Sequence, residues 1–165
     1  MTDSARNIRA RLANVDEAAQ IAAILHQAFV EYEPLYTPAG YSATTPTADQ
    51  IRQRWNEGPV WVAFHDDGMV GTIAAVPKDH RLYIRSMAIL PSARGLKIGK
   101  LLLDHVERFA IDGNFNRMFL STTPFLLPAI RLYETYSFVK TGEGPHDLAG
   151  TPLFTMEKKL KPLKL

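Results

Sequence analysis

Apolar residues recur at two spacings along the first part of the chain, and each spacing predicts an element. Residues 6–12 predict a short first strand. Asn14, followed three positions later by Glu17, is typical of a helix N-terminus. Apolar residues then continue at helical spacing, at Val15, Ala18, Ala22, Leu25 and Phe29. A strand and a helix therefore open the chain.

The next segment has no such pattern. Residues 32–47, "YEPLYTPAGYSATTPT", are rich in tyrosine and proline without a clear period, which predicts a loop. A short amphipathic helix is predicted over 48–57.

Three apolar runs in the middle of the chain predict strands. "PVWVAF" (59–64) and "MVGTIAAV" (69–76) flank "HDDG", a sequence typical of a hairpin. A third run, "RLYIRSMAIL" (81–90), ends at Pro91. Together they predict an antiparallel meander.

The remainder alternates between helix and strand. Helical spacing begins at Ile98 and ends at Gly113-Asn114, and a buried strand is predicted at 117–122. The later elements are a helix at 124–136, a strand "FVK" at 138–140 and a last strand at about 151–158. The order β-α-α-β-β-β-α-β-α-β-β predicts an α/β fold (mixed α+β) with six to seven strands and helices on both faces. Its single strand–helix–strand unit predicts one parallel pair of neighbouring strands.

Composition restricts the class of protein. The 165 residues are 46% apolar and 22% charged, with a net charge of +2, as expected for one domain over residues 1–165 that is not a nucleic-acid binder. The absence of cysteine excludes disulfides, thiolate metal ligands and a cysteine nucleophile. The sequence shows neither a leader nor a stretch long enough to span a membrane. We therefore expect a cytoplasmic protein that associates with no membrane and binds no metal ion.

A basic, glycine-containing stretch follows the third run. "SARGLKIGK" (92–100) lies between a strand and a helix, where free backbone N–H groups favour phosphate. It does not fit a P-loop, because Arg94 and Leu101 occupy positions that the motif reserves for glycine and for serine or threonine. It also lacks the third glycine and the early position of a dinucleotide-binding motif. A helix start with solvated cations remains the simpler alternative for this stretch alone.

The surroundings of that stretch resemble a known family. "MAILPSARGLKIGKLLLDHVERFA" is similar to the [QR]-x-x-G-x-[GA] region of the GNAT acetyl-CoA-dependent N-acetyltransferases, and "PAIRLYETYSF" (128–138) is similar to their second conserved helix. The resemblance runs from about residue 6 to 158 and implies a GNAT-like, mostly antiparallel sheet. Three positions depart from the family pattern: Lys97 and Ser137 replace glycines, and Leu126 stands where many members carry an asparagine.

The resemblance implies a cofactor site for acetyl-CoA, the co-substrate. Its expected residues are Met87, Ala88, Ile89, Arg94, Gly95, Leu96, Lys97, Ile98, Gly99, Lys100 and Leu126. The backbone of the first three would pair with the pantetheine arm, and the loop after them would bind the pyrophosphate. Lys97 must either keep a helical conformation or bear left-handed strain of about 1 kcal/mol or more. Whether its side chain meets phosphate or solvent stays open.

The resemblance also implies catalytic residues. Tyr133 matches the family's general acid, against the alternative of a tyrosine that only packs. Ser121 stands where some members carry a glutamate, and either orients water or the acceptor or is a plain strand hydroxyl. The general base stays open among Glu31, Glu33 and His80, each of which is equally a solvated residue.

The acceptor is expected between the 32–47 segment and residues 142–152. Tyr32, Tyr36 and Tyr41 either line a pocket or cover the core, and Arg85 faces either the acceptor or the surface. His146 and Asp147 are expected in a turn, since two adjacent side chains are a poor metal set.

The predicted function is transfer of acetyl from acetyl-CoA to a primary amine by direct attack, on a small-molecule or peptide acceptor. A homodimer is compatible with the family. The alternative is a non-catalytic acyl-CoA sensor of the same fold, and a nucleotide-phosphate enzyme is a further rival.

Overall fold

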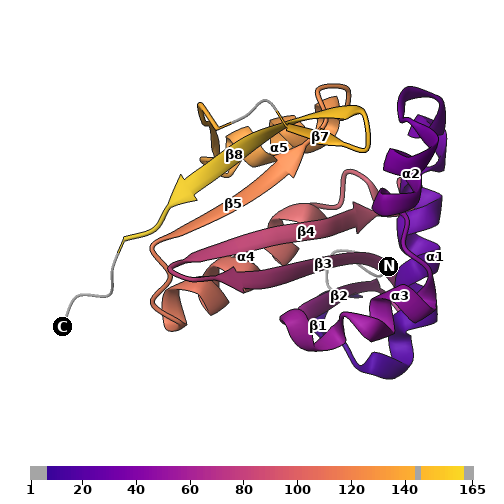
Figure 1. Ribbon diagram of the computed structural model, residues 1–165. Coiled ribbons are helices and arrows are strands. Elements are labelled where there is room, and N and C mark those ends of the chain that lie inside the picture. Colours follow the sequence, from indigo (N-terminus) through magenta and orange to yellow (C-terminus); the bar gives the residue numbers. More distant parts are fainter. Residues whose placement is uncertain (1–6, 144–145, 162–165) are drawn as a thin grey trace.

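The computed structural model describes residues 7–143 and 146–161 as an eight-stranded sheet with flanking helices (Figure 1). Residues 1–6, 144–145 and 162–165 lie outside this description. They include the start of the predicted first strand (residue 6), part of the predicted acceptor segment (144–145) and both ends of the predicted domain. The strands are β1 (Ile8–Leu12), β2 (Val60–His65), β3 (Gly68–Lys78), β4 (Arg81–Ile89), β5 (Arg117–Thr122), β6 (Val139–Lys140), β7 (His146–Leu148) and β8 (Thr151–Lys159). The α-helices are α1 (Ala18–Phe29), α2 (Pro38–Thr44), α3 (Ala48–Gln53), α4 (Ile98–Asp112) and α5 (Leu127–Thr135). Short 3-10 helices are η2 (Val15–Glu17), η3 (Val30–Leu35), η4 (Trp55–Glu57) and η5 (Pro91–Ala93).

The sheet has the order β1-β2-β3-β4-β5-β8-β6, with β7 paired to β8. All of these pairs are antiparallel except β4 with β5, which is parallel. The predicted mixed sheet, its meander and its one parallel pair are confirmed.

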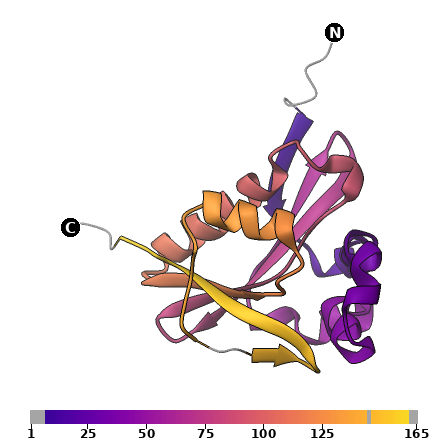
Figure 2. The same ribbon diagram turned by 90° about the horizontal axis from the view of Figure 1, so that it is seen from above.

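Two helical layers enclose the sheet. Figure 2 shows α1, α2 and α3 gathered on one side and α4 and α5 on the other. The core under α4 includes Leu102, Leu103 and Val106, and the core under α1 includes Ile21 and Leu25. Both faces of the central strands are therefore buried, as continuous apolar runs predict.

Local sequence signals set several boundaries. The backbone N–H of Asn14 donates to Glu17 Oε1 at 2.9 Å, so the predicted capping interaction forms, although a 3-10 turn precedes α1. Asn114, with φ 62°, closes α4 in the left-handed conformation that asparagine tolerates.

The prediction of a loop at 32–47 is wrong, because η3 and α2 occupy much of it. Thr37 accepts the N–H of Gly40 and Pro38 stands at the first helical position, two local start signals. The backbone N–H of Thr37 also donates to Thr151 Oγ1 at 2.9 Å, and the Thr37 hydroxyl to the carbonyl of Ala149 at 2.8 Å. Contacts with a hairpin more than 100 residues away hold this helix.

The prediction of a turn at His146 and Asp147 is also wrong, because both belong to β7. The turn lies just beyond, at Ala149 and Gly150, whose φ angles are 51° and 95°. His146 Nε2 lies 3.1 Å from Thr155 Oγ1 on the paired strand. Pairing with β8 converts an ambiguous polar segment into an edge strand. The predicted helix at 48–57 likewise divides into α3 and η4.

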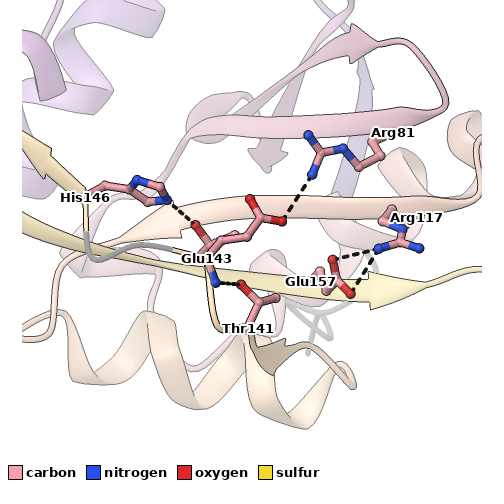
Figure 3. A network of polar contacts seen from close by, with 7 residues as sticks. Arg81, Arg117, Thr141, Glu143, His146 and Glu157 are labelled. Carbon is pink, nitrogen blue, oxygen red and sulfur yellow. Dashed lines mark hydrogen bonds and ion pairs between the residues drawn. The ribbon is translucent and has the colours of Figure 1, made fainter.

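Polar contacts fasten β4, β5 and β8 at one end of the parallel pair (Figure 3). Arg81 on β4 donates to Glu143, and Arg117 on β5 donates to both carboxylate oxygens of Glu157 on β8, at 3.3 and 3.4 Å. Arg81 also covers the ring of Phe119 at 4.3 Å. The parallel pair is closed at this end.

Candidate active site

The parallel strands separate at their other end. Ladder pairing between β4 and β5 stops at Tyr83 and Phe119, yet β4 continues to Ile89 and β5 to Thr122 (Figure 1). Beyond Tyr83, the edge of β4 that faces β5 has no ladder partner among the described strands. An extended ligand could pair with that edge.

A cavity of about 440 Å³ occupies the opening between these strands. Its lining comes from the two strands and from α1, η3, α2, α5 and the β7–β8 hairpin. Its lining residues include Phe29, Tyr32, Tyr36, Arg54, Tyr83, Arg85, Ser86, Met87, Ala88, Ile89, Arg94, Ser121, Thr123, Leu126, Leu132 and Tyr133.

A bulge in β4 shapes the wall of this cavity. Thr72 pairs with Ala88 and Ala74 with Arg85, so Ser86 and Met87 together oppose the single residue Ile73. Ser86 has a φ of 55°. Such a bulge shifts the alternation of side chains and breaks the regular ladder. Of the expected cofactor residues, Met87 belongs to the bulge and Ala88 and Ile89 follow it, and all three line the cavity.

The 94–100 loop enters α4 from the mouth of the cavity. Arg94 lines the cavity, and Gly95 is left-handed with φ 86°. Lys97 is the N-cap of α4, with φ 62° and ψ 26°, and provides no side-chain cap. Of the two alternatives for Lys97, the structure has the left-handed one. The N–H groups of the first turn, from Ile98 to Lys100, point out of the helix end without intrahelical partners.

The charges around this helix end are arranged unevenly. Arg94 pairs with Glu31 of η3, and Lys100 pairs with Asp104 one turn further along α4. The exposed Lys97 has no carboxylate within 4.0 Å in the part of the chain that the structure describes. The positive helix end and these cations favour an anion here.

Gly99 has a packing role. A Cβ placed there would lie 2.5 Å from Leu132 Cδ2 and 3.1 Å from Met87 Cε. The glycine therefore lets α4 approach α5 and β4 closely. Leu96 packs partly buried against the same core.

Tyr133 lies on α5 with its hydroxyl at the cavity. The hydroxyl donates to Met87 Sδ at 3.7 Å, and the ring packs edge-on against Phe138 at 5.8 Å. Only 7% of the residue is exposed. Burial raises the pKa of this phenol well above its ordinary value, and nearby Tyr36 raises it further. Tyr133 is therefore held as a neutral proton donor with only a weak sulfur acceptor.

Two more of the expected site residues line the same cavity, whereas Gly95 to Lys100 are not among its lining residues. Ser121 lines it from β5, opposite Thr155 of β8, and Leu126 lines it as the N-cap of α5. Of the three side chains left open as bases, Glu31 is paired with Arg94 and Glu33 is exposed on η3. His80 lies in the β3–β4 turn, at the far end of β4 from Met87.

The acceptor side of the cavity contains residues that the sequence left open and one that it missed. Tyr32 and Tyr36 line it, whereas Tyr41 packs behind them with its ring 6.0 Å from that of Tyr36. Arg85 also lines it, with its guanidinium paired to Glu57 of η4. The sequence alone does not distinguish Arg54, because it is one of two arginines in the predicted helix at 48–57.

Two negative findings concern the described residues only. Between 7 and 143 and between 146 and 161, no three His, Cys, Asp or Glu side chains gather closely enough to hold a metal ion. Within the same ranges no helix has both the length and the apolarity to cross a membrane.

An open strand edge, a helix N-terminus at the cavity mouth and a buried tyrosine are the features that the resemblance to acetyltransferases leads us to expect. The sequence model of the acetyltransferase (GNAT) family matches residues 23–138, and the chain belongs to this family.

Characterised and uncharacterised relatives agree with this assignment. The uncharacterized N-acetyltransferase YjgM of Escherichia coli is 30% identical over 124 residues, which cover 72% of this chain and 74% of YjgM. Human N-acetyltransferase 8B is 34% identical over 89 residues, covering 50% of this chain and 39% of the human protein. The chain thus matches less than half the length of the human relative.

Solved structures share the fold. A GNAT-family acetyltransferase from Staphylococcus aureus Mu50 superposes with a TM-score of 0.75 at 20% identity, covering 93% of this chain and 99% of the other. The structure of yncA from Salmonella typhimurium with its cofactor acetyl-CoA gives a TM-score of 0.71 at 20% identity, covering 94% and 95%.

Proposed function

We propose that this protein transfers the acetyl group of acetyl-CoA to a primary amine by direct attack, with Tyr133 as the general acid. The observation that carries the proposal is the cavity between the separated ends of β4 and β5, with the Tyr133 hydroxyl on its wall. Family membership and a fold neighbour with acetyl-CoA support the choice of co-substrate.

The cofactor is expected to enter along the α4 end of the cavity. The N–H groups of Ile98, Gly99 and Lys100 would receive the pyrophosphate, with charge from Arg94 and Lys97. Gly95 and Leu96 complete that loop. The amide-rich pantetheine arm would pair with the free edge of β4 at Met87, Ala88 and Ile89 beside Leu126, as an added strand does.

The reaction then needs three groups at the inner end of the arm. A backbone N–H beyond the β4 bulge would polarise the thioester carbonyl as its oxygen becomes negative. The amine nitrogen forms a bond to the carbonyl carbon, the carbon–sulfur bond breaks, and the leaving thiolate takes the proton of Tyr133. The proton lost by the amine passes to water, which Ser121 would orient. Tyr133 is reprotonated from solvent at the end of the cycle.

Direct attack by the amine is favoured by the composition. The sequence contains no cysteine, so an acetyl-thiol intermediate on the protein is excluded. The acceptor is a small-molecule or peptide amine that reaches the cavity from the side of η3 and α2.

The test combines a binding and a turnover assay. Calorimetry with acetyl-CoA measures cofactor binding, with ATP as the comparison ligand. Thiol release over a panel of primary amines measures turnover, and the mass of each product confirms acetylation. Binding of acetyl-CoA with no turnover on any amine would favour the sensor alternative, and binding of ATP instead would favour the nucleotide rival.

A further inference from the structure

Two arginines from separate elements meet on the acceptor side of the cavity. Arg54 follows α3, and its Nη2 donates to Ser86 Oγ in the β4 bulge at 3.0 Å. Arg85 lies on β4 itself, and its Nη2 donates to Glu57 Oε1 of η4 at 2.7 Å. Both side chains line the cavity.

The charge of this pair is only partly balanced. Glu57 compensates Arg85, whereas Arg54 has no carboxylate within 4.0 Å in the described part of the chain. Burial lowers the pKa of the Arg54 guanidinium, and the charge of Arg85 lowers it further, while Glu57 opposes the shift. The positive charge of Arg54 is therefore not balanced by a neighbouring carboxylate among the described residues.

An unused donor points to the same deficit. The buried Nε of Arg85 has no hydrogen-bond partner in the part of the chain that the structure describes. A buried polar group without a partner is costly, so such donors are typical of a site that a ligand completes.

The rest of the lining supplies no negative charge. Its charged residues are Arg54, Arg85 and Arg94, and it contains no aspartate or glutamate. Arg94 lies by the 94–100 loop and pairs with Glu31, so it belongs to the cofactor side. The uncharged part of the lining includes the aromatic residues Phe29, Tyr32 and Tyr83.

We propose that the acceptor is an amine that carries a carboxylate, such as an amino acid, and that Arg54 and Arg85 bind this carboxylate. The inference rests on the proposed acetyl transfer and names its substrate class. Guanidinium groups bind carboxylates through paired, charge-assisted hydrogen bonds. The carboxylate would balance the charge left over at Arg54.

Binding at this position also helps the chemistry. The carboxylate fixes one end of the acceptor at the β4 bulge and directs its amine toward the thioester.

The test compares acceptors that differ only in the carboxylate. Leucine, leucinamide and isoamylamine form one such set, and phenylalanine, phenylalaninamide and phenethylamine form another. With saturating acetyl-CoA, kcat/KM for the carboxylate member should exceed that of its amide and amine by about tenfold or more. Arg54→Gln and Arg85→Gln should remove this preference through the acceptor KM and leave the acetyl-CoA Kd unchanged.

Arg52→Gln is the matched control. Arg52 lies two residues before Arg54, pairs with Asp49 at 2.7 Å and leaves 47% of its side chain exposed, and it is not a lining residue. This variant should retain the carboxylate preference. Thermal unfolding of every variant identifies one that fails to fold. If Arg54→Gln fails to fold, the comparison of acceptors on the unaltered protein still tests the proposal.

The failures are distinguishable. Equal or better turnover of the amides and amines would overturn the carboxylate site while acetyl transfer stands. An equal loss on all acceptors in both arginine variants would mean that the arginines only support the fold, and would also overturn it. Absence of turnover on the whole panel would overturn it as well, and would remove the proposed function with it.

Discussion

At the scale of the residue, the Tyr133 hydroxyl is the group that the proposed chemistry needs most. Tyr133→Phe keeps the ring and its packing on Phe138 while removing the hydroxyl that Tyr133 of α5 contributes to the cavity lining. We expect kcat to fall by roughly 100-fold or more, as for loss of a general acid. The Kd for acetyl-CoA, measured by calorimetry, should change by less than about twofold, since the ring is unchanged.

Tyr136→Phe is the control for that substitution. Tyr136 lies at the end of the same helix, and its hydroxyl donates to Asp104 at 2.5 Å rather than facing the cavity. Its kcat should stay within about twofold of the unaltered protein, because a structural hydrogen bond on the surface is worth little to the barrier. An unchanged kcat in Tyr133→Phe would remove that residue from the mechanism.

Lys97 is expected to affect two properties that can be measured separately, the stability of the fold and the binding of acetyl-CoA. Its left-handed backbone is costly for a side chain, so Lys97→Gly should raise the free energy of unfolding by about 1 kcal/mol. The same change removes a cation at the helix end, so acetyl-CoA binding should weaken by roughly twofold to fivefold. Urea unfolding measures the first effect and calorimetry the second.

Lys97→Gln removes the charge and keeps the side chain. It should reproduce the weaker binding without the gain in stability. Tighter acetyl-CoA binding in Lys97→Gly would instead mean that the lysine obstructs the phosphate site.

At the scale of the element, α5 is followed by Ser137, which like Lys97 stands where the family pattern has a glycine. Ser137 has a φ of 76°, and the N–H of Phe138 donates to the carbonyl of Tyr133 at 2.9 Å, as in a glycine-terminated helix. Ser137→Gly should therefore stabilise the fold by about 1 kcal/mol in urea unfolding. Ser92→Gly is the contrast, because Ser92 lies in η5 without a positive φ, and there glycine should lower stability or leave it unchanged.

At the scale of the whole molecule, buried tyrosines predict how stability depends on pH. Burial raises the pKa of Tyr36, Tyr83 and Tyr133 above the ordinary value. Below about pH 10 both folded and unfolded chains keep these phenols protonated, so stability does not depend on them. Above that pH the unfolded chain releases protons that the folded one retains, and stability falls as pH rises.

The loss should reach about 1.4 kcal/mol per pH unit for each such tyrosine. Urea unfolding at pH 8 and at pH 10.5 measures it. Tyr133→Phe should show a smaller loss than the unaltered protein. The same loss in both would contradict the burial of an un-ionised Tyr133.

Most of the order of elements along the chain, and the position of the 94–100 loop between a strand and a helix, could be predicted because their signals are local. Alternation of apolar residues, the "HDDG" turn and the Asn14–Glu17 cap each act within a few residues. The two wrong predictions, a loop where α2 lies and a turn where β7 lies, have one shared cause. The two segments hold each other through Thr37, Ala149 and Thr151, and neither has a strong period of its own. Sequence reasoning also could not separate Arg54 from Arg52, because only the fold turns one of them toward the cavity.

The sequence by itself determined the mixed sheet, the one parallel pair, the helix that begins at Ile98 and the motif positions of Arg94, Gly99 and Tyr133, because periodicity and turn chemistry are short-range. Only the tertiary structure decided that β4 and β5 separate beyond Tyr83, and that Lys97 and Ser137 adopt the conformation of the glycines they replace. It also decided that Arg54 and Arg85 meet at the β4 bulge. These features depend on contacts between segments far apart in the chain, whose energies no local pattern records.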